Sequence, residues 1–234
     1  MSKYKYILWD VDGTLLDFSY SQKISLFKCL EKIGVTGTDE LNAIYTEINE
    51  RWWKNLELGL VTKKELLSGR FVDFFEACNI ACSDVDAFRE SYQYELGVNF
   101  VPMEGAIEVC DKLKNLGFHQ YVVTNGVTST QKTKLSLSGF DKLMDEIFIS
   151  EQIGVPKPHI DFFDTCFSKI KEQDTEFDLT KVLIVGDSLS SDMQGGINAG
   201  IDTCFYAPTL VEREKTVTYQ IQSLYEVLSI LGVK

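Results

Sequence analysis

The chain has 234 residues, of which 44% are hydrophobic and 25% charged, and its formal net charge is −12. This length and composition are typical of a globular protein with one large domain or two modest ones. The acidic balance argues against a general nucleic-acid binder, because no surplus of basic residues exists to neutralise phosphates. No apolar run is long enough to span a bilayer and no signal-peptide pattern follows Met1, so we expect a cytoplasmic protein without a membrane partner. The six cysteines are dispersed, and the sequence lacks the two pairs of Cys or His residues that a zinc site needs. We therefore expect the cysteines to be free thiols.

The first predicted strand is Tyr4–Trp9, a run of aromatic and aliphatic residues that leads into Asp10-Val11-Asp12-Gly13-Thr14. Two interpretations fit this local pattern. Asp-Gly is a common hairpin turn, with Thr14–Leu16 as the returning strand. Alternatively, a buried parallel strand ends here and places its carboxylates at the edge where open α/β sheets bind ligands. The turn alone does not decide between the two.

Residues 18–100 carry the apolar spacing of amphipathic helices. Thr62 and Glu65 form a capping box at the start of one of them. Aromatic residues at helical spacing usually build a core, so Trp52, Arg70 and their neighbours are not assigned to ligand binding. The four predicted helices are Ser21–Ile33, Glu40–Leu56, Thr62–Asn79 and Asp84–Leu96.

After Pro102, helices alternate with short β-rich runs, which predicts a parallel sheet with right-handed crossovers. The predicted fold class is α/β: a doubly wound, mainly parallel, Rossmann-like sheet formed by residues 1–17 and 101–234, with an all-helical cap inserted at 18–100. The predicted elements are helix Gly105–Leu116, strand His119–Thr124, helix Ser129–Ser138, strand Glu146–Ile149, helix Ile160–Lys171, strand Lys181–Val185, helix Met193–Ala199, strand Thr203–Tyr206 and helix Ser223–Leu231.

Polar residues follow the predicted strands at each carboxyl end, and in a parallel sheet these ends face one crevice. Taken singly, Asn125-Gly126 is a turn, Lys157 a solvated loop lysine, and Asp187 or Ser188 a helix N-cap. Together, carboxylates, a hydroxyl and a lysine are the groups that phosphoryl transfer with a hard cation uses. The residues concerned are Asp10 and Asp12, Thr124 and Asn125, Lys157, and Asp187 and Asp192.

These residues resemble the four motifs of the haloacid dehalogenase-like phosphohydrolase superfamily, and a helical cap inserted after the first motif is that family's layout. Stretches 49–53, 124–131, 149–158 and 195–200 resemble more closely the YjjG-type pyrimidine 5′-nucleotidases. The dehalogenases of the superfamily usually lack an acid at the position of Asp12 and need no magnesium. Asp12 together with Asp187 therefore favours phosphate chemistry.

The resemblance implies a role for each residue. Asp10 is expected to be the nucleophile that forms an aspartyl-phosphate, and Asp12 the general acid and base. Asp10, the backbone carbonyl of Asp12 and Asp187 are expected to bind Mg²⁺, with Asp192 acting on the ion indirectly or through water. Thr124 and the amide of Asn125 would bind phosphate oxygens, and Lys157 would offset the negative charge around Asp10.

The expected function is hydrolysis of a small phosphomonoester with Mg²⁺ as cofactor, and pyrimidine nucleoside 5′-monophosphates are the favoured substrates. Two alternatives within the superfamily stay open: a phosphatase for phosphoglycolate or sugar phosphates, and a phosphomutase. A third, from another class, is a phospho-accepting signalling module, which also gathers acids, a threonine and a lysine around Mg²⁺. The expected assembly is a monomer or a weak homodimer.

Overall fold

The chain divides into two compact units in the computed structural model, which describes residues 2–209 and 212–233. One unit combines Met1–Phe18 with Val101–Lys234, and the other is Ser19–Phe100. The predicted core range also contains Met1, Leu210, Val211 and Lys234, which lie outside the described residues.

The first unit is built on a six-stranded sheet in the order β3-β2-β1-β4-β5-β6, and every neighbouring pair is parallel. The predicted parallel α/β sheet is therefore confirmed. The hairpin interpretation of Asp12-Gly13 is wrong, because β1 lies between β2 and β4 in the sheet and pairs in parallel with both. Leu16 forms isolated bridges instead, a parallel one with Asp12 and an antiparallel one with Pro102. The strands are β1 (Tyr6–Trp9), β2 (His119–Thr124), β3 (Glu146–Ile149), β4 (Val182–Gly186), β5 (Asp202–Tyr206) and β6 (Tyr219–Ile221). The sequence patterns did not predict β6.

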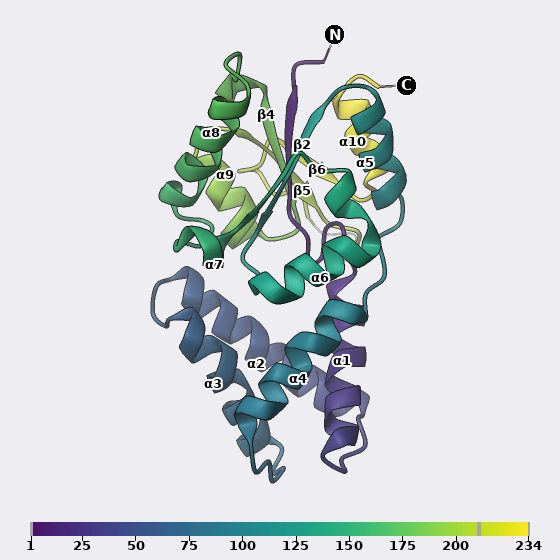
Figure 1. Ribbon diagram of the computed structural model, residues 1–234, viewed down its shortest axis with the longest axis vertical. Helices are drawn as coiled ribbons and strands as arrows, with labels where there is room; N and C mark the ends of the chain where they lie inside the picture. Colours follow the sequence, from purple (N-terminus) through teal and green to yellow (C-terminus); the bar gives the residue numbers. More distant parts are fainter. Residues whose placement is uncertain (1, 210–211, 234) are drawn as a thin grey trace. The chain divides into compact units, whose positions relative to one another are not determined.

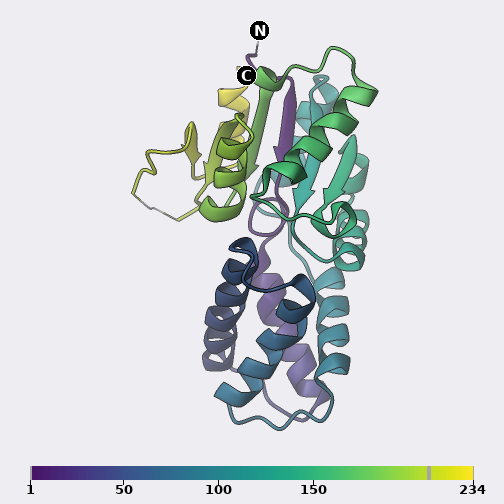
Figure 2. The same cartoon turned by 90° about the vertical axis from the view of Figure 1, so that its left-hand side faces the viewer.

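Helices cover both faces of this sheet. In Figures 1 and 2, α8 and α9 lie on one face and α5 and α10 on the other. This two-sided cover explains why all four residues of β1 are fully buried and apolar rather than alternating. The helices of this unit are α5 (Ala106–Asn115), α6 (Thr128–Ser138), α7 (Ser150–Ile153), α8 (Ile160–Gln173), α9 (Gln194–Asn198) and α10 (Tyr225–Ile230), with short 3₁₀ segments at Phe140–Lys142 and Leu179–Lys181 and a π-helical segment at Leu189–Met193.

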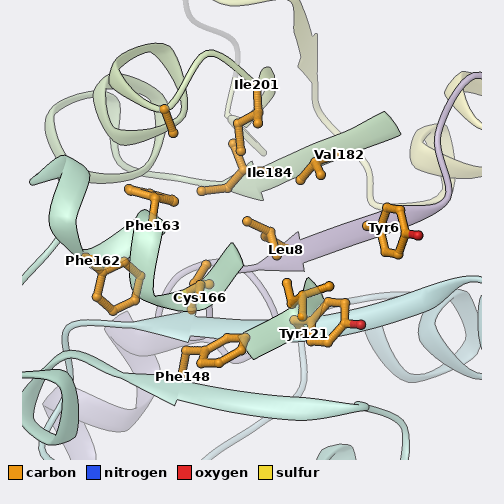
Figure 3. Packing of buried hydrophobic residues seen from close by; sticks show 13 residues of the cluster. Tyr6, Leu8, Tyr121, Phe148, Phe162, Phe163, Cys166, Val182, Ile184 and Ile201 are labelled. Atoms are coloured by element: carbon orange, nitrogen blue, oxygen red, sulfur yellow. The ribbon is translucent and has the colours of Figure 1, made fainter. Parts of the chain in front are cut away.

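One hydrophobic core cluster joins the sheet to α8. Alternate residues of the central strands, such as Tyr6 and Leu8 of β1, belong to this cluster together with Phe163 and Cys166 of α8 (Figure 3). Trp9 has the opposite parity and belongs to the other face, where its indole N–H donates to the buried side chain of Gln120 at 3.1 Å. The packed sheet holds the carboxyl ends of β1, β2 and β4 in fixed positions.

The second unit contains most of α1 (Phe18–Lys32) together with α2 (Asp39–Glu57), α3 (Lys63–Ala77) and α4 (Val85–Val98). The capping box of Thr62 and Glu65 is confirmed at the start of α3. Phe71 and Tyr92 are fully buried, and Tyr45 stacks on Phe71 with ring centroids 5.4 Å apart. These three aromatic residues therefore belong to the core of this unit, as their helical spacing indicated, whereas Tyr20 and Tyr94 are exposed and Trp52 is partly buried.

No helix among the described residues has both the length and the apolar character needed to cross a membrane. All six cysteines carry free thiols, and four of them are buried.

Candidate active site

Three parallel strands end beside one another and carry the predicted polar residues at this edge. Asp10 directly follows β1, and its amide donates to the carbonyl of Val185 in β4 at 2.9 Å. This bond keeps Asp10 in register with the end of the neighbouring strand, so that its carboxylate lies beside the loop that follows β4. Thr124 is the last residue of β2, and its hydroxyl accepts a hydrogen bond from the amide of Gly126 at 3.1 Å.

Lys157 is buried at the centre of this edge, with only 1% of its side chain exposed. Its ammonium group donates to Asp10 at 2.8 Å, to Asp192 at 2.6 Å and to the carbonyl of Val123 at 2.7 Å. Three acceptors match the three donors of a lysine, which offsets the cost of removing its charge from water. The interpretation of Lys157 as a solvated loop lysine is therefore wrong.

Asn125 holds the backbone of Lys157 in place. Its side-chain amide donates to the carbonyl of Lys157 and its side-chain oxygen accepts the amide of the same residue, both at 2.9 Å. This paired contact joins the loop after β2 to the segment before α8, across 32 positions of sequence. This contact was not predicted for Asn125, and the phosphate-binding role of its amide stays a prediction.

The loop after β4 contains both a helix cap and an acid. The hydroxyl of Ser188 accepts the amide of Ser191 at 3.1 Å and caps the π-helical segment, so the N-cap interpretation is right for Ser188. The same segment brings Asp192 back, and its carboxylate accepts the amide of Ser188 at 3.2 Å. Asp187 plays no capping role, and its carboxylate lies 3.4 Å from the hydroxyl of Thr14.

Asp10, Asp187 and Asp192 each place a carboxylate oxygen within 4.8 Å of the others. Gly13 makes room for the carboxylate of Asp187, because a Cβ at this position would lie 2.2 Å from one of its oxygens. Its φ of +95° is also a backbone conformation that favours glycine. Oxygen donors of this kind suit a hard divalent cation such as Mg²⁺. The residues present therefore fit a magnesium ion, although the side chain of Asp12 is not part of this cluster.

The charges of this cluster oppose one another. Burial, reinforced by Asp192 and opposed by Lys157, raises the pKa of Asp10 to about 7. Burial raises the pKa of Asp187 well above its ordinary value, and the negative charges of Asp10 and Asp192 add to this effect. Burial lowers the pKa of Lys157, but the Asp10 and Asp192 carboxylates outweigh it and raise that pKa above its ordinary value. Three ionised carboxylates with one ammonium carry a net charge of −2, which one divalent cation cancels.

The crowding of these acids predicts an effect on stability. We expect Asp187→Asn to raise the melting temperature of the metal-free protein at neutral pH by about 2–4 °C, which corresponds to roughly 1 kcal/mol for a chain of this size. The reason is that the folded state disfavours the ionised form of Asp187. Adding Mg²⁺ should reverse the order, since the parent protein then gains more stability than the variant. Melting curves in a chelator and in excess Mg²⁺ measure both effects.

The dependence of stability on pH is a second test of the same crowding of acids. The pKa of Asp10 is about 7 when folded against an ordinary value of 3.8, so the folded state binds more protons between these limits. Stability of the metal-free protein should therefore fall as the pH rises from about 4 to about 7. Asp164→Asn, at an exposed position of α8, is the matched control and should leave both the slope and the Mg²⁺ response unchanged. An Asp187→Asn protein that melts below its parent in chelator would contradict the argument.

Asp12 lies apart from the carboxylate cluster, and two residues that the sequence analysis gave no role contact it. Gln131 donates to one carboxylate oxygen of Asp12 at 2.6 Å, and the ammonium of Lys134 contacts the other. Both side chains come from α6 and both are buried. The signal available in the sequence was their spacing of three positions, which places two long polar side chains on one face of a short helix.

A Rossmann-like parallel sheet with this arrangement of acids and a buried lysine defines a hydrolase of the haloacid dehalogenase-like class. Residues 4–200 match the family of haloacid dehalogenase-like hydrolases, and the chain belongs to it. The pyrimidine 5′-nucleotidase PynA of Streptococcus pneumoniae is 35% identical over 97% of this chain and 95% of its own length. The pyrimidine 5′-nucleotidase YjjG of Escherichia coli is 29% identical over 98% of both chains.

A comparison with a solved structure also shows similarity along the whole chain. The crystal structure of the putative hydrolase YfnB from Bacillus subtilis, bound to magnesium, superposes with a TM-score of 0.89. The two sequences are 32% identical, and the match covers 98% of this chain and 99% of YfnB. The chain therefore resembles its relatives along both the sheet and the helical insertion.

Proposed function

We propose that this protein is a magnesium-dependent phosphatase that hydrolyses nucleoside 5′-monophosphates, with pyrimidine nucleotides as the preferred substrates. The observation that carries the proposal is the pair of acids after β1, with Asp10 bonded to the buried Lys157 and grouped with Asp187 and Asp192. The likeness to PynA and YjjG supports the choice of nucleotides. In this proposal residues 1–17 and 101–234 form the catalytic core and residues 18–100 the inserted cap.

Asp10 acts as the nucleophile. One of its carboxylate oxygens attacks phosphorus and forms an aspartyl-phosphate, while the bond from phosphorus to the ester oxygen breaks and its electron pair stays on that oxygen. Asp12 donates a proton to this leaving oxygen, and the alcohol departs. Asp12 then accepts a proton from the water that attacks the phosphorus of the aspartyl-phosphate. The bond from phosphorus to the Asp10 oxygen breaks, which releases inorganic phosphate and returns Asp10 to its carboxylate and Asp12 to its protonated form.

Other residues bind and orient the phosphoryl group. The hydroxyl of Thr124 and the amide of Asn125 bind its oxygens, and the ammonium of Lys157 offsets the negative charge that collects around Asp10. Asp10, the backbone carbonyl of Asp12 and Asp187 would hold Mg²⁺, with Asp192 beside them. When bound, the ion supplies positive charge that lowers the repulsion between an anionic nucleophile and an anionic phosphate.

Phosphate release from a panel of phosphomonoesters, with and without Mg²⁺, tests the proposal. We expect kcat/KM for UMP, dUMP and dTMP to exceed that for phosphoglycolate and sugar phosphates by about tenfold or more, a difference of ~1.4 kcal/mol in transition-state binding. Equal or better turnover of phosphoglycolate or a sugar phosphate would overturn the nucleotide assignment. Isomerisation of a sugar phosphate without phosphate release would identify a mutase. Stoichiometric phosphorylation without turnover would identify a signalling module.

A further inference from the structure

Each acid of the first motif has its own buried lysine. Lys157 bonds Asp10 at one side of the β1 loop, and Lys134 bonds Asp12 from α6. Within residues 2–209 and 212–233, these are the lysines whose side chains are almost fully enclosed, at 1% and 2% exposure. Lysine is rarely buried unless it is paired, so the contact between Lys134 and Asp12 needs an explanation.

The two donors on α6 divide the carboxylate of Asp12 between them. The ammonium of Lys134 takes one oxygen, and the side-chain amide of Gln131 donates to the other at 2.6 Å. Since only the N–H₂ end of a glutamine side chain can donate to a carboxylate, this contact also sets which way the amide points. A carboxylate held at both oxygens by two buried groups has lost most of its rotational freedom, whereas Asp12 itself stays 25% exposed.

The lack of a side chain at Gly126 makes room for Gln131. A Cβ at this residue would lie 1.9 Å from the amide nitrogen of Gln131 and 2.6 Å from its amide carbon. The side chain of Gln131 therefore occupies the space that a side chain at position 126 would need. Because Gly126 follows Thr124 and Asn125, the loop after β2 joins the predicted phosphate-binding residues to the support of Asp12. Asn125-Gly126 is more than the turn that its sequence suggests.

We propose that Lys134 and Gln131 are positioning residues, which hold the carboxylate of Asp12 where it exchanges a proton with the leaving oxygen. The inference rests on the proposed function and adds two residues to it. The two oxygens of the Asp12 side chain have about four positions for hydrogen bonds or a proton, so two bonds from α6 leave one position on each oxygen, and one of these carries the proton that Asp12 gives to the leaving oxygen. Misplacing a reacting group by about 1 Å costs roughly 10²-fold in rate, which is the size of effect expected from releasing Asp12.

The test compares two leaving groups. An alkyl phosphate such as UMP needs a proton on its departing oxygen, whereas p-nitrophenyl phosphate releases a stable phenolate without one. The parameter kcat/KM reports on the steps through formation of the aspartyl-phosphate, so the later role of Asp12 toward water does not enter. We expect Lys134→Met and Gln131→Met each to lower kcat/KM for UMP by about 10–10²-fold, with a loss for the aryl ester at least tenfold smaller.

Controls separate positioning from damage to the site. Asp12→Asn should show the same selectivity with a larger loss, because it removes the acid itself. Lys132→Met changes an exposed lysine of the same helix and should leave both substrates unaffected. The rise in melting temperature with Mg²⁺ should persist in Lys134→Met and Gln131→Met, since neither residue belongs to the carboxylate cluster. If Lys134→Met does not fold, Gln131→Met carries the test alone.

Equal losses for both esters, or no loss for either, would overturn the inference. Failure of the proposed phosphatase activity gives a different result, because the parent protein would then release phosphate from no phosphomonoester. If the parent prefers another alkyl phosphate to UMP, the same comparison is made with that ester, and a selective loss still supports the role of Lys134 and Gln131.

Discussion

Asp10→Asn should lower phosphate release by about 10⁴-fold or more while the protein stays folded. The substitution keeps the shape of the side chain and its place beside Val185, but it removes the oxygen that would attack phosphorus. Steady-state release of phosphate from UMP in excess Mg²⁺ gives the loss in rate. Acid quench followed by mass spectrometry should find one added phosphoryl group on the peptide containing Asp10 in the parent protein and none in the variant.

Two further variants serve as controls for this experiment. Asp10→Ala removes the same oxygen and controls for slow deamidation of the introduced asparagine back to aspartate. Asp164→Asn alters an exposed acid of α8 and should retain full activity. Appreciable turnover in both Asp10 variants would show that another group attacks phosphorus. A parent protein that accumulates the phosphorylated peptide without releasing phosphate would support the signalling module instead.

Lys157→Met should cost about 3–5 kcal/mol of folding stability and lower the melting temperature by roughly 6–20 °C. The methionine fills a similar volume but leaves the carboxylates of Asp10 and Asp192 buried without their shared partner. The carbonyl of Val123 also loses its donor. Chemical denaturation of both proteins in the absence of Mg²⁺ measures the difference.

A second substitution identifies the cause of the loss. If unpaired negative charge is responsible, Lys157→Met combined with Asp192→Asn should recover part of the stability, and the double-mutant cycle should be non-additive. Lys181→Met is the matched control, because the side chain of that lysine is half-exposed and forms an exposed ion pair with Asp178, so the substitution should change stability by less than about 0.5 kcal/mol. A Lys157→Met protein as stable as its parent would mean that the buried ion pairs contribute nothing net.

Local patterns along the chain predicted the elements that depend on local spacing. The strand at 119–124 and the helix of α3 with its capping box follow from side-chain periodicity and from Thr62 and Glu65. The polar residues after each strand were visible for the same reason. In a parallel sheet the carboxyl ends lie at one edge, so recognising the strands was enough to expect Asp10, Lys157 and Asp187 near one another.

Strand β6 is an element that local sequence patterns did not predict. Tyr219–Ile221 is three residues long, and it becomes a strand because β5 offers an unpaired edge. A segment of three residues is too short to show a period, and it is ordered by pairing with β5, which lies outside the segment itself. The π-helical segment at Leu189–Met193 is similar, since its return places Asp192 against Lys157 rather than completing a regular helix.

The amino-acid sequence by itself determined the class of fold and the acids of the site, because both depend on residue type and on local order along the chain. Only the tertiary structure decided which group each acid contacts. Lys134 meets Asp12 across 122 positions and Lys157 meets Asp10 across 147. Such pairings depend on the packing of α6 and of the loops after β1 and β2 against the same sheet edge. The two lysines have the same side chain, but the fold pairs Lys134 with Asp12 and Lys157 with Asp10.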